Sequence, residues 1–425
     1  MHISHWLLIG LTAATPVTVS AATQDLPAAP HYRVRLEVDP AARHIRVTGS
    51  LTLPARDTLT VFLHRQLEVR SFRVAGGPEH EIDADDHGIR YLPEAIRVRV
   101  PSPASRRGGR MEVGFEYEGT ITDWPEWSAS VIGPEWTEIG LYFPWFPYHP
   151  DLGPFTYELE VVHDPAYTVA AMGARETHDG VTTFRRSTPT NDMVVTAAPA
   201  LQVSETRLGE STFRVAETEL ADATVDSILA DVSWLQTFYG DWLGPVAGDL
   251  LLVASEREQG GGYARMGGLF LAGFEDDAYL GNRTGYLRYL GHELAHLWWY
   301  RADSNTWHDW LNESLAEYSA LRAIRERVGK AEYRRRLAAK REEASGTPPI
   351  YGLDRNSEHA EAVLYDKGPV LLADLEDRIG SDRFRAFTRL LIEREVTTTT
   401  DFLDTLQGMM GREVRRWFEA RLRDP

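Results

Sequence analysis

The sequence predicts a two-domain α+β protein, and three observations support this class. Residues 31–203 alternate apolar with polar residues in short runs, which Gly, Pro, Asp and Asn clusters separate. Beyond residue 285 nearly the whole chain has apolar residues at helical spacing instead. The 425 residues, 43% of them hydrophobic, suffice for two packed cores. We therefore expect an N-terminal β-sandwich or saddle at 23–205, followed by a mainly helical domain at 206–425.

Individual elements follow from the same periodicities. The clearest period-two runs are residues 32–38, 45–53, 96–100 and 157–162. Residues 141–149 are rich in aromatic residues and proline, a composition that lines clefts or packs between layers. In the second half, residues 221–238 predict an amphipathic helix and residues 250–254 predict a short strand.

The first 22 residues have the composition of a secretory signal. An apolar run at 6–14 precedes small residues around Ala21 that can form a cleavage site, although His2 and His5 stand where Lys or Arg is usual. We expect export to the periplasm or the medium, with a short uncleaved membrane anchor as the alternative. No insertion into the membrane is expected after the signal is cleaved.

Charge and cysteine content exclude several classes of protein. A formal net charge of -18 argues against binding to nucleic acid or to an anionic membrane. The chain has 0 cysteines, so disulfides and thiolate metal sites are excluded. A transition metal would have to be held by His, Asp or Glu. No oligomeric state is predicted.

Two histidines four residues apart give the strongest chemical signal in the sequence. In His292-Glu293-Leu294-Ala295-His296 this spacing places both imidazoles on one face of a helix, where both can bind one metal ion. The carboxylate of Glu293 emerges near that face. It can take a proton from the attacking water and return it to a leaving group. The stretch is therefore typical of metallohydrolases.

The neighbouring segments provide the context that a five-residue motif needs. Residues 285–300 have apolar residues at helical spacing and no proline, as expected for a buried helix. Residues 310–318 predict a second helix on which Glu313 and Glu317 lie one turn apart. Either carboxylate can be a third ligand. Two histidines and one carboxylate leave the fourth position of a zinc ion open for water.

The chain resembles the zinc aminopeptidases of the aminopeptidase N and leukotriene-epoxide hydrolase type over most of its length. Its motifs at 292–296 and 310–313 match the paired zinc-ligand motifs of that family. Residues 362–372, in which a Tyr precedes Asp-Lys-Gly, match its tyrosine motif, and residues 151–157 and 417–422 match further landmarks.

The resemblance implies a thermolysin-like catalytic domain that holds one zinc ion. His292, His296 and Glu313 are then the zinc ligands. Glu293 is the general base, and Tyr365 donates a hydrogen bond to the oxyanion. A phenol, with its usual pKa of about 10, stays protonated at neutral pH and can make this donation.

Three features depart from the family pattern. The interval between His296 and Glu313 is shorter than usual, which predicts a shortened loop near 302–306 that leaves both helices intact. Glu317 remains the alternative ligand; otherwise it supports the ligands or lies on the helix surface. Larger relatives also continue into further domains that often cover the cleft, whereas this sequence stops at Pro425. We expect a more open site, which favours longer peptides or proteins as substrates.

The third departure lies in the segment that binds the substrate. In the family a Gly-Ala-Met-Glu-Asn motif provides a glutamate for the substrate's free amino terminus, and here Arg265 takes that position. A guanidinium repels an α-ammonium group and attracts a carboxylate, so Glu256 or Glu258 would have to bind the amine. The glycines can still form an open strand edge that pairs with an extended peptide. The predicted substrate-binding residues are Gly261, Gly262, Tyr263, Ala264 and Arg265.

The sequence thus predicts an exported zinc metallopeptidase, aminopeptidase-like, whose partner is a peptide or protein substrate. Two alternatives remain open. Arg265 favours an endopeptidase or a carboxylate-directed peptidase. The atypical Gly-rich strand is also compatible with a binding protein that retains zinc without turnover.

Overall fold

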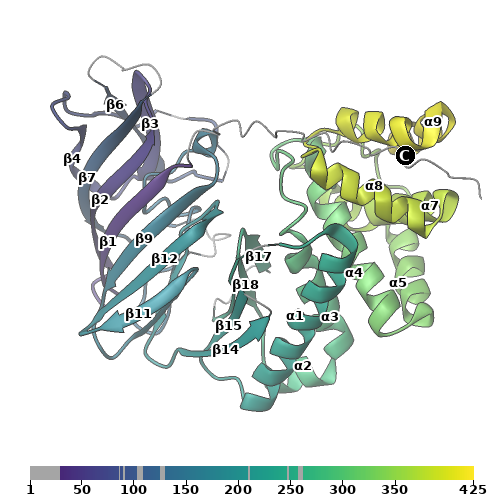
Figure 1. The fold of residues 1–425 in the computed structure, drawn as a ribbon, viewed down its shortest axis with the longest axis horizontal. Coiled ribbons are helices and arrows are strands. Elements are labelled where there is room, and N and C mark those ends of the chain that lie inside the picture. The colour runs from purple at the N-terminus through teal and green to yellow at the C-terminus, as the bar shows by residue number, and fades with distance from the viewer. Residues whose placement is uncertain are drawn as a thin grey trace, which may run out of the picture.

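A computed structural model describes most of the chain beyond residue 28. The described residues are 29–85, 87–89, 91–102, 109–124, 130–208, 211–246, 248–256 and 262–425. The predicted signal at 1–22 lies outside them. Within the described part, no helix combines the length and apolar character needed to cross a membrane. A β-rich domain lies beside a second domain in which a small sheet is followed by helices (Figure 1).

The N-terminal domain is built on a seven-stranded sheet with the order β11-β12-β9-β1-β2-β7-β4. Every second residue of its strand β1 is buried, so one face of the sheet packs on the core while the other faces solvent. In chain order these strands are β1 His31–Asp39, β2 His44–Pro54, β4 Glu68–Val74, β7 Arg110–Thr120, β9 Phe155–Val162, β11 Ala174–His178 and β12 Val181–Thr190.

Two three-stranded sheets complete the N-terminal domain, with the orders β3-β6-β5 and β10-β13-β8. Their strands are β3 Thr58–His64, β5 Glu81–Asp83, β6 Ala95–Pro101, β8 Thr137–Ile139, β10 Thr168–Ala171 and β13 Val195–Ala198. A single 3-10 turn, η1 Pro150–Leu152, precedes β9. Trp145 and Phe146 of the aromatic segment are buried in the core of this domain, so this part of the segment packs between layers. The four predicted strands correspond to β1, β2, β6 and β9.

A five-stranded sheet with the order β14-β15-β16-β18-β17 joins the two domains along the chain. Its strands are β14 Gln202–Leu208, β15 Ser211–Glu217, β16 Leu250–Ser255, β17 Gly262–Arg265 and β18 Gly268–Ala272. The predicted domain boundary at 205/206 falls inside β14, whose pairing with β15 assigns it to this second sheet. Strand β17 is at the sheet's edge, between the β-domain and the helices (Figure 1).

The remainder of the chain is helical, as the periodicity predicts. The helices are α1 Asp222–Leu243, α2 Asp276–Gly281, α3 Arg283–Ala295, α4 Trp310–Arg327, α5 Lys330–Glu343, α6 Ala360–Ala362, α7 Gly368–Ile379, α8 Ser381–Glu393 and α9 Thr399–Arg423. A 3-10 turn, η2 Trp307–Asp309, precedes α4, and a π-helical turn, η3 Val363–Lys367, precedes α7. A single apolar core joins these helices to the five-stranded sheet, and this core fixes α3 against α4.

Candidate active site

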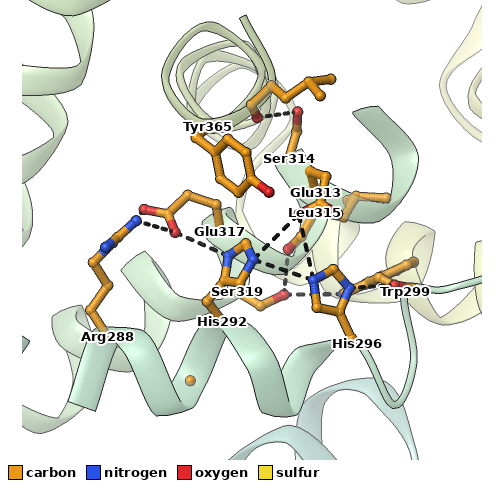
Figure 2. Close-up of polar contacts among 12 residues, drawn as sticks. Arg288, His292, His296, Trp299, Glu313, Ser314, Leu315, Glu317, Ser319 and Tyr365 are labelled. Carbon is orange, nitrogen blue, oxygen red and sulfur yellow. Dashed lines mark hydrogen bonds and ion pairs between the residues drawn. The ribbon is translucent and has the colours of Figure 1, made fainter. Parts of the chain in front are cut away.

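Three predicted ligands converge where α3 meets α4 (Figure 2). The Nε2 atoms of His292 and His296 are 3.3 Å apart. Oε2 of Glu313 lies 3.4 Å from the first of these nitrogens and 3.5 Å from the second. Zinc–ligand bonds of about 2.0–2.1 Å at tetrahedral angles require ligand atoms roughly 3.3–3.4 Å apart. The three side chains therefore fit a tetrahedral zinc ion whose fourth position is open.

Helix α3 is shorter than the sequence predicts, because it ends at Ala295 rather than continuing toward residue 300. His296 is its C-cap, with φ -64° and ψ -10°, and so keeps its side chain on the same face as His292. Nδ1 of His296 donates to the carbonyl oxygen of Trp299 at 2.8 Å. This hydrogen bond fixes the tautomer and leaves Nε2 for a metal.

Glu317, the alternative ligand, contacts His292 and is not among the three residues whose ligand atoms converge. Its Oε2 lies 3.1 Å from Nδ1 of His292, and Arg288 binds both of its oxygens, at 2.7 and 2.9 Å (Figure 2). Nζ of Lys340 is 2.8 Å from Oε1. Burial acts to raise the pKa of the Glu317 carboxyl, but the hydrogen bond to His292 and the two cations outweigh it and hold that pKa well below its usual range. An ionised Glu317 orients the imidazole of His292 and makes it a better metal ligand.

Glu293 is buried on α3 and lies against the edge strand β17. A Cβ atom added to Gly262 would be 2.8 Å from Oε1 of Glu293 and 2.6 Å from the side chain of Leu271. A larger residue at this position would have to displace the ends of the Glu293, Leu271 and Tyr289 side chains, which all lie within 3 Å of the added atom. Gly262, predicted to bind substrate, also gives Glu293 its space. Gly261 lies outside the described residues.

Tyr365 approaches the ligands from the π-helical turn η3 (Figure 2). Its ring centroid is 5.5 Å from that of His292. Burial and the nearby Glu313 carboxylate raise the pKa of its phenol, so Tyr365 stays protonated at neutral pH and can donate a hydrogen bond. Nζ of Lys340 donates to the carbonyl oxygen of Tyr365 at 2.7 Å and thereby links this turn to Glu317.

The short loop before α4 is held by the helix itself. Asn312 Oδ1 accepts from the amide of Ala302 at 3.1 Å, and its Nδ2 donates to the carbonyl of Ala302 at 2.9 Å. Asn312 also donates to Asp309, which binds Nε of Arg355 at 2.7 Å. The predicted shortening near 302–306 thus leaves Glu313 anchored at the start of α4.

Arg265 does not present a free charge to a substrate. Its side chain is 8% exposed, and its Nε donates to Oδ2 of Asp192, which is 0% exposed, at 2.7 Å. The rings of Tyr142 and Tyr263 lie 4.7 and 4.5 Å from its guanidinium carbon. Arg265 was predicted to attract a substrate carboxylate. In the structure its guanidinium pairs instead with a carboxylate of the protein itself, that of Asp192.

Of the two predicted substitutes for the amine-binding glutamate, Glu256 has an exposed side chain that bonds to Thr218. The other, Glu258, lies outside the described residues.

A carboxylate from the other domain was missed by sequence reasoning. Glu138 of β8 is buried and accepts hydrogen bonds from Ser255 Oγ at 2.7 Å and from the Tyr263 hydroxyl at 2.8 Å. Tyr263 directly follows Gly262, so Glu138 lies close to the strand that adjoins Glu293. No local motif marks Glu138, because the contact depends on the packing of the two domains. Arg288, one helical turn before His292, could have been found from its spacing.

Comparisons with known proteins agree with this geometry. Residues 277–420 match the model of the Peptidase family M1 domain. A mutant of a two-domain M1 zinc metallopeptidase bound to L-tryptophan matches with a TM-score of 0.71 and 19% identity, over 94% of this chain and 95% of that chain. An M1 zinc metallopeptidase mutant from Deinococcus radiodurans, bound to a Tyr-Ser-Ala substrate, matches with a TM-score of 0.70 and 20% identity, over 94% and 95%. No curated protein matches the sequence.

A His-His-Glu ligand set on two packed helices, with a buried carboxylate and a protonated phenol beside it, defines a zinc metallopeptidase site. The chain is a hydrolase, and its residues 277–420 match a peptidase domain of family M1. The two-domain fold of the M1 zinc metallopeptidases extends over nearly the whole chain. The resemblance inferred from the sequence is confirmed.

Replacing Glu317 with Gln tests the support of His292. The amide cannot hold the imidazole as a carboxylate does, so we expect zinc affinity to fall by about 10- to 100-fold. Competition with a chromophoric chelator measures this affinity. Glu332→Gln is the control, because Glu332 forms an ion pair with Arg336 away from the site. Equal zinc affinities for Glu317→Gln and the wild type would contradict the assignment.

Gly262→Ala tests the contact between β17 and Glu293. The added methyl group must displace the ends of the Glu293, Tyr289 and Leu271 side chains. A shifted Glu293 carboxylate is misplaced for its reaction, so we expect kcat to fall by about tenfold while zinc is retained. In the control, Gly114→Ala, the added Cβ meets nothing within 4 Å. Steady-state kinetics and elemental analysis provide the measurements, and a wild-type kcat in Gly262→Ala would refute the steric role.

Proposed function

We propose that this protein is an exported aminopeptidase that uses one zinc ion and requires a free amino terminus on its peptide substrate. The observation that carries the requirement is Glu138, a buried carboxylate that binds Tyr263 beside the edge strand β17. Gly262, the preceding residue of the same strand, lies against Glu293. One strand thus adjoins both an anionic group and the general base.

The chain's own residues would divide the reaction among them. A zinc ion held by His292, His296 and Glu313 would supply a Lewis acid that polarises the scissile carbonyl and lowers the pKa of water. Glu293 accepts a proton from the attacking water and passes it to the leaving amine. Tyr365 donates a hydrogen bond to the carbonyl oxygen as negative charge develops on it.

An extended peptide would add to the sheet along β17, whose outer edge pairs with no strand of the described residues. In this arrangement the α-ammonium group binds Glu138. A carboxylate offers about four acceptor positions. Glu138 can therefore accept from the Ser255 and Tyr263 hydroxyls and from an ammonium group at the same time. Burial strengthens the ion pair and penalises a substrate whose amine is blocked.

Two further observations support this proposal over the alternatives. The Arg265 charge, on which a carboxylate-directed peptidase would depend, is neutralised by buried Asp192. The Deinococcus radiodurans relative, as a mutant, is bound to a Tyr-Ser-Ala substrate. Export rests on the sequence of residues 1–22.

Glu293→Gln tests the chemistry of the site. The amide cannot accept the proton of the attacking water, so we expect kcat to fall by about 10²- to 10⁴-fold. Zinc content, measured by elemental analysis, should stay at one ion per chain. Hydrolysis by this variant at the wild-type rate would show that Glu293 is not the general base.

Glu138→Gln tests the amine anchor. Loss of a charged hydrogen-bond partner should raise KM for a free-amine peptide by about 10- to 100-fold. Glu116→Gln, on the exposed face of β7, serves as the control. Paired assays with free and acetylated peptides measure the preference for an amine. Efficient cleavage of acetylated peptides by the wild type, or an unchanged KM in Glu138→Gln, would exclude the anchor.

A further inference from the structure

Arg265 links the edge strand β17 to the N-terminal domain by a buried ion pair. Its Nε donates to Oδ2 of Asp192 at 2.7 Å, and the two side chains are 8% and 0% exposed. Nη1 donates to the carbonyl of Ala264 at 2.9 Å. Because Asp192 already pairs with its guanidinium, Arg265 does not offer an uncompensated charge to a substrate. Such a pair instead fixes the relative position of the segments that carry it.

Asp192 also organises the N-terminal side of this contact. Its Oδ1 accepts from the backbone amides of Leu141 and Met193, at 2.9 and 2.6 Å. Leu141 immediately precedes Tyr142, whose ring lies 4.7 Å from the guanidinium carbon of Arg265. The carboxylate thus holds Arg265 and the backbone that leads to Tyr142 together.

The guanidinium in turn places Tyr263. Side chains alternate along a strand, so Tyr263 and Arg265 share the face of β17 opposite to Gly262. The Tyr263 ring lies 4.5 Å from the guanidinium carbon, and its hydroxyl donates to Glu138 at 2.8 Å. A continuous chain of contacts therefore runs from Asp192 through Arg265 and Tyr263 to Glu138.

We propose that the Arg265–Asp192 ion pair is a positioning device that sets, through Tyr263, the place of the Glu138 carboxylate. This inference rests on the proposed function, in which Glu138 binds the substrate amine. Arg265 then occupies the strand position of an amine-binding glutamate without binding the amine. The guanidinium holds in place the carboxylate that the other domain supplies.

Arg186 provides a matched control, because it is a second buried arginine that spans the two domains. It is 4% exposed and donates to the carbonyls of Asp249 and Met266, at 2.9 and 3.2 Å. None of its hydrogen bonds reaches Tyr263 or Glu138. Loss of Arg186 should weaken the domain contact without moving the amine anchor.

The experiment compares Arg265→Met, Arg265→Lys and Asp192→Asn with Arg186→Met in the full-length zinc enzyme. KM and kcat are measured for a free-amine peptide and its acetylated form, beside the melting temperature. We expect Arg265→Met and Asp192→Asn to raise KM for the free-amine peptide by about tenfold with a smaller change in kcat. Arg265→Lys keeps the ion pair without the planar stack and should give a partial rescue. Arg186→Met should lower the melting temperature and leave KM unchanged.

Three outcomes would contradict the positioning role of Arg265, and each can be told apart from a failure of the proposed function. If Glu138→Gln raises KM while Asp192→Asn and both Arg265 variants leave it unchanged, the positioning role is wrong and the proposed function stands. If Arg186→Met raises KM as much as Arg265→Met, the effect is general loosening of the domain contact. If Arg265→Met weakens binding of acidic peptides alone, Arg265 is a substrate ligand. Asp192→Asn and Arg265→Lys decide the question should Arg265→Met fail to fold.

Discussion

Two packed helices hold two imidazoles and a carboxylate with their ligand atoms 3.3–3.5 Å apart, and the rest of the site depends on this close approach. Like-charged or lone-pair-bearing groups do not stay so close without a cation or shared protons between them. The core that fixes α3 against α4 imposes the geometry, and Glu317 stiffens it through His292. A metal ion bound to these three groups would therefore also stabilise the packing of α3 against α4.

The N-terminal domain contributes more than a cover for the catalytic domain. Asp192 and Glu138, both fully buried, contact the edge strand β17 through Arg265 and Tyr263. Buried charged groups are costly to leave without partners, so these contacts favour one arrangement of the two domains. The edge strand is consequently placed by both domains, while the metal ligands come from one.

The sequence predicted what depends on local spacing. The paired histidines, Glu313 and the strand alternation all follow from helical or strand periodicity, and the structure places them as expected. Glu138 and Arg265 depend on partners 125 and 73 residues away in the chain, which no local pattern specifies. Residue type gave the charge of Arg265 but not the buried Asp192 that neutralises it. For the same reason Glu138 was missed.

The strand β17 has a further consequence if it carries the substrate between Glu138 and Glu293. The separation of these two carboxylates then sets how far the bond to be cut lies from the end of the peptide. A fixed separation releases a fragment of the same length in each cycle. The new amino terminus of the shortened peptide can then bind Glu138 again. Sliding one domain along the other would change the length of the fragment released without altering any group that performs the chemistry.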